Sequence, residues 1–140
     1  MKILILCTGN SCRSQMAEGF LKSFDSSLEV FSAGTNPASH VNPNTITVMN
    51  EVGINLSKNF PKSVNQFLNK DFDYVITVCG GAKETCPVFL GKVKNQLHIG
   101  FDDPAEATGT KDQILGVYRR VRDEIQEQFY KLYTSKLRKT

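Results

Sequence analysis

The first residues of the chain pass from an apolar run into a polar loop and then into an amphipathic pattern. Residues Lys2 to Leu6 are almost continuously apolar, which is typical of a parallel strand buried on both faces. The loop from Thr8 to Arg13 is polar and small, and from Ser14 apolar side chains recur at helical spacing. The sequence therefore predicts a buried strand, a tight loop and a helix, in that order.

The same alternation continues along the chain. Further strands are expected at 28–32, 72–78 and 96–99, and further helices are expected after Asn42-Pro43, at 64–68 and from Asp112 onward. Strands that alternate with helices imply a parallel sheet covered on both sides. We therefore predict one α/β domain over 1–140, a three-layer sandwich with an open, mostly parallel four-stranded sheet and helices on both faces. The tail 134–140 is expected to fray.

The charge and hydropathy patterns exclude several classes of function. Lys and Arg number 17 against 14 for Asp and Glu, and a net charge of +3 is too small to indicate a nucleic-acid or membrane partner. The first apolar run is too short for an export signal, and no apolar stretch approaches the roughly 20 residues of a membrane span. We expect a cytoplasmic protein. In that reducing compartment Cys7, Cys12, Cys79 and Cys86 are expected to rest as thiols.

The first loop has the composition of an oxyanion site. Small and polar residues with Gly9 and Asn10 allow successive N–H groups to turn inward at a helix start. Arg13 can contact two oxygens of a tetrahedral anion, and the same field lowers the pKa of Cys7 toward the roughly 3.5–7.5 range of activated thiols. The alternative is a buried strand-end cysteine with an ordinary surface arginine. The predicted anion-binding residues are Thr8, Gly9, Asn10, Ser11, Cys12, Arg13 and Ser14, with Cys12 in a packing role.

The first loop and the start of the helix that follows it have the sequence Cys7-Thr8-Gly9-Asn10-Ser11-Cys12-Arg13-Ser14-Gln15-Met16-Ala17-Glu18-Gly19. This stretch resembles the signature of thioredoxin-coupled arsenate reductases, which share the low-molecular-weight protein tyrosine phosphatase fold. The resemblance extends over nearly the whole chain. It includes Ser32-Ala33-Gly34, Val41-Asn42-Pro43, Glu51-Val52-Gly53, Cys79 with Cys86-Pro87, Gly100-Phe101-Asp102-Asp103-Pro104 and Arg120-Val121-Arg122-Asp123-Glu124-Ile125.

The resemblance implies a cysteine relay that reduces arsenate to arsenite. Cys7 would attack arsenate, Cys79 would attack the adduct and release arsenite, and Cys86 would then displace Cys7 to leave a Cys79–Cys86 disulfide for thioredoxin. Asp103 would act as the general acid, with Asp102 as the weaker candidate. Seven positions separate Cys79 from Cys86, so a helical segment there would have to unwind on oxidation.

Two other functions stay open at this stage. The first is a small tyrosine phosphatase that works through a Cys7 phosphocysteine. Gln15, where phosphatases of the fold usually have proline, and Ala105, where they usually carry tyrosines after Asp-Pro, disfavour it. The second is a redox-responsive binding module without catalysis. We expect a monomer with no cofactor, and the cysteine spacings do not suggest zinc.

Related reductases can hold a potassium ion beside the loop. The resemblance assigns its ligands to Asn10, Glu18 and Ser32, with Lys62 where an aspartate is expected. We therefore expect the Lys62 ammonium to replace the ion, bonding Asn10 and pairing with Glu18, so that activity does not depend on potassium. The alternative is a lysine that points into solvent.

Overall fold

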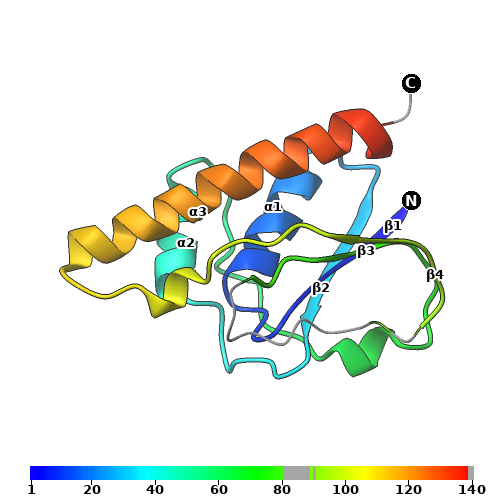
Figure 1. Cartoon of the computed structure of the whole chain (residues 1–140), viewed down its shortest axis with the longest axis horizontal. Coiled ribbons are helices and arrows are strands. Elements are labelled where there is room, and N and C mark those ends of the chain that lie inside the picture. Colours follow the sequence, from blue (N-terminus) through cyan, green and yellow to red (C-terminus); the bar gives the residue numbers. More distant parts are fainter. Residues whose placement is uncertain (81–88, 90, 139–140) are drawn as a thin grey trace.

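Four parallel strands form the sheet, in the order β2-β1-β3-β4. The computed structural model describes residues 1–80, 89 and 91–138. The strands are β1 (Lys2–Cys7), β2 (Glu29–Gly34), β3 (Phe72–Thr77) and β4 (Val93–His98). The helices are α1 (Arg13–Phe24), α2 (Pro43–Asn50), the 3-10 turns η1 (Val64–Phe67) and η2 (Pro104–Glu106), α3 (Lys111–Leu132) and a final π-helical turn η3 (Tyr133–Leu137) (Figure 1).

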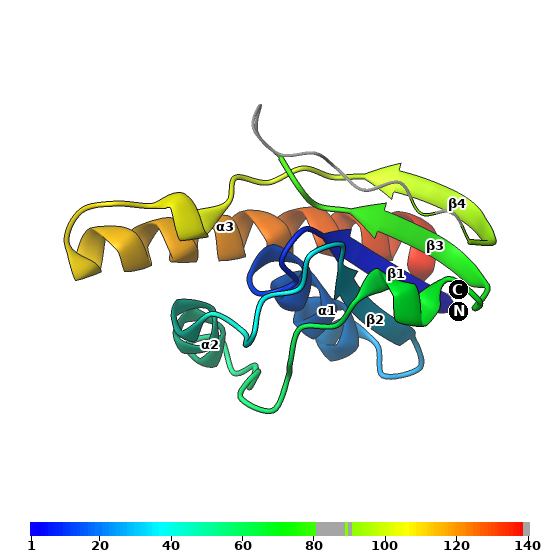
Figure 2. The ribbon, with the colours of Figure 1, turned by 90° about the horizontal axis from the view of Figure 1, so that it is seen from below.

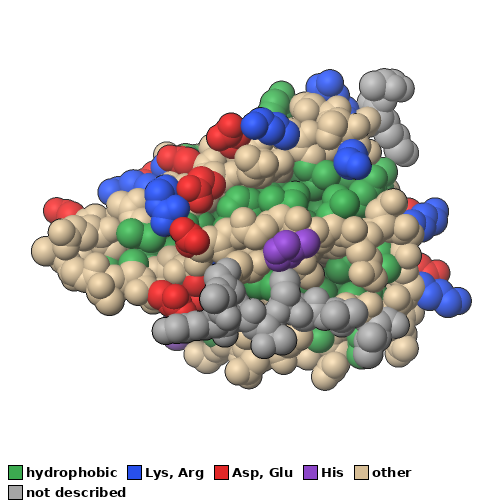
Figure 3. Space-filling model, viewed as in Figure 1, with side chains coloured by type: hydrophobic (Ala, Val, Ile, Leu, Met, Phe, Trp, Pro, Cys, Tyr) green, Lys and Arg blue, Asp and Glu red, His purple; other side chains and the backbone are tan. Residues whose placement is uncertain are grey.

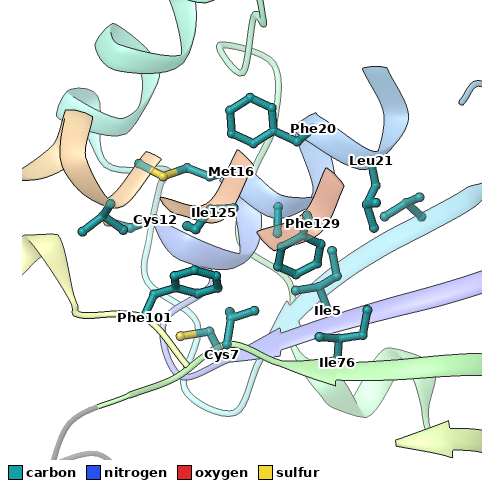
Figure 4. Close-up of a cluster of buried hydrophobic side chains, with 14 of the residues drawn as sticks. Ile5, Cys7, Cys12, Met16, Phe20, Leu21, Ile76, Phe101, Ile125 and Phe129 are labelled. Carbon is teal, nitrogen blue, oxygen red and sulfur yellow. The ribbon is translucent and has the colours of Figure 1, made fainter. Parts of the chain in front are cut away.

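Strand β1 is central and is buried on both faces, as its apolar run predicts. Ile3, Ile5 and Cys7 face the larger core cluster, which includes side chains of α1, α2 and α3 (Figure 4). Leu4 and Leu6 face the smaller cluster, to which η1 contributes Phe67. Figure 2 shows the long helix α3 running along one side of the sheet, with η1 on the other. The α/β fold class is confirmed.

Several element ends differ from the sequence expectation by one or two residues, and two larger differences have clear physical reasons. Strand β4 begins at Val93 rather than at Gln96, because an edge strand tolerates exposed polar residues such as Lys94 and Asn95. The tail does not fray from Thr134, because η3 buries Tyr133 and Leu137 and the Tyr133 hydroxyl donates to Asp25 at 3.0 Å. The segment 81–88, for which unwinding was expected, lies outside the described residues. No described helix is both long and apolar enough to cross a membrane.

Helix α2 is fixed to α3 by arginines. Arg119 donates to both carboxylate oxygens of Glu51, and Arg122 donates to Glu51 at 2.8 Å and to the carbonyl oxygen of Val48 at 2.9 Å. Charged side chains also gather over the outer side of α3 in Figure 3. These contacts hold α2, and with it the segment before α2 that borders the first loop.

The Glu51 contacts predict a dependence of stability on pH. The hydrogen bond from Arg119 is the main cause that lowers the pKa of Glu51 from 4.5 to about 2. A carboxyl whose pKa is lowered by folding stabilises the protein above its unfolded pKa, and this contribution is lost as the pH falls from about 4.5 toward 2. We expect Glu51→Gln to lower the melting temperature at pH 7 and to flatten its fall in that window. Melting curves from pH 2 to 7 check this, with the exposed Glu127→Gln as the matched control; equal curves for Glu51→Gln and the parent would contradict it.

Candidate active site

The loop between β1 and α1 makes a tight turn. Strand β1 ends at Cys7, Cys12 is the N-cap residue of α1, and Arg13 is its first helical residue. Asn10 has a φ of 51°. Among the described residues, it is the single non-glycine residue whose φ is positive. Asparagine tolerates this left-handed conformation better than most residues, which explains its place at the turn.

Six consecutive carbonyl oxygens of this loop, from Cys7 to Cys12, accept hydrogen bonds from residues around it. The distances run from 2.9 Å at Gly9 to 3.4 Å at Cys7. The donors, in order, are the N–H groups of Thr35, Asn36 and Ala38, the side-chain amide of Gln15, and the N–H groups of Asn42 and Met16. Because C=O and N–H point in opposite directions across a trans peptide, the N–H groups that follow these carbonyls face the concave side. Successive inward N–H groups of this kind form a nest, an arrangement suited to an oxyanion.

The concave side of the loop borders a cavity of about 200 Å³. Its lining is the loop from Cys7 to Arg13 together with Asp103 and Ala105. The start of α1 adds the positive end of a helix dipole. The structure therefore brings the predicted nucleophile, arginine and acid to one small cavity. Ser14 is fully buried beneath it, and its hydroxyl accepts a 2.7 Å hydrogen bond from the Asn10 amide.

Arg13 is held rigidly at the cavity. It is only 4% exposed, it donates through Nη1 to the carbonyl oxygen of Phe101 at 3.0 Å, and its Nη2 lies 3.7 Å from Asp103 Oδ2. A buried guanidinium interacts with a bound anion more strongly than a solvated one, because less water screens it. Phe101, Cys7 and Cys12 lie at the same end of the core (Figure 4).

The structure separates the two aspartates. Asp103 lines the cavity and also caps η2 by accepting from the Ala105 N–H at 3.0 Å. Asp102 instead pairs with Arg120 at 3.2 Å in a neighbouring surface hollow. Asp103 is therefore the carboxyl group within reach of a ligand in the cavity.

Cys12 is set apart from Cys7 chemically. Both are buried, and neither is disulfide-bonded. Burial is the main cause that raises the pKa of Cys12 above its ordinary value, although hydrogen bonds including one with Ser11 at 3.7 Å act in the opposite direction. A raised pKa keeps this thiol protonated and unreactive at neutral pH.

This difference predicts selective alkylation within one loop. With iodoacetamide at pH 7, Cys7 should be modified at least about ten times faster than Cys12, because the thiolate is the reacting species. Peptide mass spectrometry after timed quenching measures both rates in the same sample. Phosphate is expected to slow the reaction at Cys7. Comparable rates at the two cysteines would contradict the assignment.

Cys79 lies close to the loop in the sheet. Strand β3 pairs with β1 so that Leu6 is opposite Thr77, and the Val78 N–H donates to the Leu6 carbonyl oxygen at 3.0 Å. Cys79, one residue further on, is 1% exposed and belongs to the same core cluster as Cys7. It is disulfide-bonded, so the expectation that Cys79 is a thiol does not hold in this structure. Cys86 lies outside the described residues, so its role stays a prediction.

Lys62 does not make the contacts expected of it. Its backbone N–H, not its ammonium, donates to Asn10 Oδ1 at 2.9 Å, and the ammonium donates to the Phe60 carbonyl oxygen at 3.1 Å. Glu18 pairs with Lys22 at 2.9 Å instead. Partial burial is the main cause that lowers the pKa of Lys62.

The oxygens that a potassium ion would need are already engaged. Glu18 accepts from the Ser32 hydroxyl at 2.6 Å and from Lys22, and Asn10 Oδ1 accepts from the Lys62 N–H and from Gln15. Asn10 Oδ1 already accepts two hydrogen bonds, and the Lys22 ammonium already balances the Glu18 charge, so this arrangement does not favour a bound cation. Among the described residues, no group of three or more His, Cys, Asp or Glu side chains has the arrangement of a metal site.

A larger cavity, of about 560 Å³, lies at the opposite end of the sheet. It is lined by residues at the strand starts, including Lys2, Glu29 and Phe72. Its described lining residues include no cysteine or histidine, and their charges are of both signs. The reactive groups gather instead at the carboxyl ends of the strands, where ligands of open α/β sheets bind.

Sequence reasoning missed the residues that support the loop from outside. Gly34 is one of them, because a Cβ there would lie 2.3 Å from the Thr8 carbonyl oxygen. The segment that follows, from Thr35 to Asn42, supplies four of the six donors to the loop carbonyls. The sequence signals are the glycine near a strand end and the Asn-Pro at the start of a helix, which from the sequence alone are interpreted as boundaries and family motifs but not as supports of the loop.

Together, the fold and this cavity define a class: a parallel α/β protein with an anion-binding loop, a cysteine at its base and an arginine at its rim. The chain belongs to the low molecular weight phosphotyrosine protein phosphatase family, whose sequence profile matches residues 2–140.

Several relatives of the chain are arsenate reductases. The arsenate reductase of Shouchella clausii (strain KSM-K16) is 51% identical over 124 residues, which are 88% of each chain. A solved arsenate reductase in the phosphate binding state has a TM-score of 0.78 and 33% identity, covering 95% of this chain and 96% of that one. The thioredoxin-dependent arsenate reductase of Corynebacterium glutamicum has a TM-score of 0.65 and 29% identity, covering 96% of this chain and 60% of that one.

Proposed function

We propose that this protein is an arsenate reductase that works through a cysteine relay and is recycled by thioredoxin. The observation that carries the proposal is the pair of sulfur atoms at the carboxyl ends of adjacent strands, Cys7 in the anion loop after β1 and buried Cys79 after β3. A phosphatase needs the first sulfur but not the second. The similarity to arsenate reductases over most of the chain supports the same conclusion.

The first step is attack on arsenate. The loop N–H groups and Arg13 bind the arsenate oxygens, and the Cys7 thiolate forms a bond to As(V). Asp103 donates a proton to the oxygen that leaves, so that it departs as water. The product is a Cys7–arsenic(V) adduct held in the cavity.

The second stage moves two electrons to arsenic. The Cys79 thiolate attacks the Cys7 sulfur, the electron pair of the S–As bond stays on arsenic, and arsenite, As(III), leaves a Cys7–Cys79 disulfide. The Cys86 thiolate then attacks Cys79 and releases the Cys7 thiolate. Thioredoxin supplies two electrons to reduce the Cys79–Cys86 disulfide. We also propose that the protein acts as a monomer in the reducing cytoplasm.

A pair of assays tests the proposal against its alternatives. One sample contains arsenate, thioredoxin, thioredoxin reductase and NADPH, and both arsenite and NADPH consumption are measured. The other contains p-nitrophenyl phosphate. We expect sustained arsenite formation, and only slow aryl phosphate hydrolysis because Ala105 rather than an aromatic side chain lines the cavity. Phosphate release without arsenite would favour the phosphatase, and neither product would favour the redox-responsive binding module.

A further inference from the structure

The conformation of the anion loop depends on one side chain that has no place in the reaction itself. Six loop carbonyl groups, from Cys7 to Cys12, point away from the cavity. Five of them accept hydrogen bonds from backbone N–H groups, and the exception is the carbonyl group of Asn10. The carbonyl oxygen of Asn10 is held by the side chain of Gln15, whose Nε2 lies 3.1 Å away. Gln15 is fully buried in the first turn of α1.

We propose that Gln15 is a positioning residue of the anion loop: its carboxamide replaces the missing backbone donor, holds Asn10 in its left-handed conformation and so keeps the loop N–H groups directed at the bound oxyanion. The inference rests on the proposed function, because it concerns the anion site of Cys7. It assigns Gln15 no contact with substrate.

The contacts of Gln15 converge on the residue that most needs support. Its Nε2 also lies 3.2 Å from Asn10 Oδ1 and 3.2 Å from the carbonyl oxygen of Phe60. Since all three of these partners are oxygens, the nitrogen end of the amide faces them, and its two N–H groups are shared among the three. Its Oε1 accepts from Asn59 Nδ2 at 3.1 Å, which fixes the amide in the same orientation.

Asn10 is thereby fixed at both its backbone and its side chain. With Oδ1 accepting from Gln15 and from the Lys62 N–H, the Asn10 amide must donate through Nδ2, and it does so to the Ser14 hydroxyl at 2.7 Å. The Ser14 hydroxyl accepts this bond, so its own proton is available to another acceptor at the base of the loop. The Gln15 amide thus sets the direction of a chain of hydrogen bonds that runs beneath the anion site.

The consequence of losing this amide is specific. A side chain at position 15 with similar volume but no hydrogen-bond donor would leave the buried Asn10 carbonyl oxygen without a partner. An unpaired buried carbonyl costs free energy, and rotation of the peptide group would relieve that cost. Rotation of the Asn10–Ser11 peptide would bring a carbonyl oxygen toward the anion in place of an N–H group. Both anion binding and the fraction of Cys7 in the thiolate form would fall.

Gln15→Met is the test, because methionine keeps the volume and removes the amide. The readout is the alkylation of Cys7 by iodoacetamide between pH 4 and 9, quantified by peptide mass spectrometry, without and with inorganic phosphate. We expect roughly 3- to 10-fold weaker protection by phosphate, the factor that corresponds to one neutral hydrogen bond. The midpoint of the alkylation profile should rise by about half a unit to one unit.

Two further variants separate positioning from mere stability. Gln113→Met removes a matched amide from the capping box of α3 and should lower the melting temperature without changing either readout at Cys7. Asn59→Ala leaves Gln15 in place but removes the donor that orients it, so the same shifts are expected at smaller size. Because Asn59 is only partly buried, this variant serves if Gln15→Met does not fold.

The outcomes distinguish the two proposals. If phosphate does not protect Cys7 in the parent protein, the proposed anion site is wrong and the role of Gln15 falls with it. If the parent is protected and Gln15→Met, or Asn59→Ala in its place, gives the same protection and the same profile, Gln15 is only structural and this inference alone is overturned.

Discussion

Cys7→Ser is expected to abolish arsenate reduction and aryl phosphate hydrolysis together. Both reactions begin with attack by the same thiolate, and a serine hydroxyl ionises far less readily than a thiol and is a much weaker nucleophile. The loss of a nucleophile reduces turnover by on the order of 10⁴- to 10⁶-fold, which is below detection in either assay. The measurement is initial rates of arsenite and phosphate release at saturating substrate.

Phosphate binding provides the control for Cys7→Ser. In the proposed site the anion would be held by backbone N–H groups and by Arg13, which is fixed by Phe101 and Asp103, and the sulfur takes no part in these contacts. The variant should therefore fold and still bind inorganic phosphate in a calorimetric titration. Turnover of either substrate within about 100-fold of the parent rate would remove Cys7 from the role of nucleophile.

The parts of the fold that sequence reasoning predicted are those with a strong local pattern. Strands β1 and β3 are central, so both faces are apolar and the run is visible in the sequence. Strand β4 is an edge strand whose polar side chains are exposed, and its first three residues gave no such pattern. In the tail, the single apolar Leu137 was too isolated to predict a buried turn.

The same contrast applies to the site. Its binding loop is contiguous in sequence, so Cys7, Arg13 and the residues between them were predicted together, and the structure brings them to one cavity with Asp103. The donors that orient the loop come from irregular segments around 34–42 and 59–62, which have no periodic pattern. Their role depends on tertiary hydrogen bonds, as does the pairing of Glu18 with Lys22 instead of Lys62.

Cys79→Ser is expected to stop arsenate reduction while sparing hydrolysis of a small aryl phosphate. Reduction requires a second thiolate to attack the Cys7 sulfur and leave an electron pair on arsenic, and the register of β1 with β3 puts Cys79 at the adjacent strand end. Hydrolysis needs only the loop, Arg13 and Asp103. Rates of arsenite release with the thioredoxin system and of p-nitrophenol release, measured on the same preparation, check both halves of the expectation.

A single-turnover experiment distinguishes the two relay cysteines. Without thioredoxin, reduced Cys86→Ser should release one equivalent of arsenite and stop as a Cys7–Cys79 disulfide, because two of its thiols still supply two electrons. Reduced Cys79→Ser should release none, because its Cys7–arsenic adduct has lost the thiol that resolves it. Peptide mapping identifies the disulfide in each case. If Cys79→Ser reduced arsenate at the parent rate with thioredoxin, the electrons would have to reach arsenic by another route and the order of the relay would be wrong.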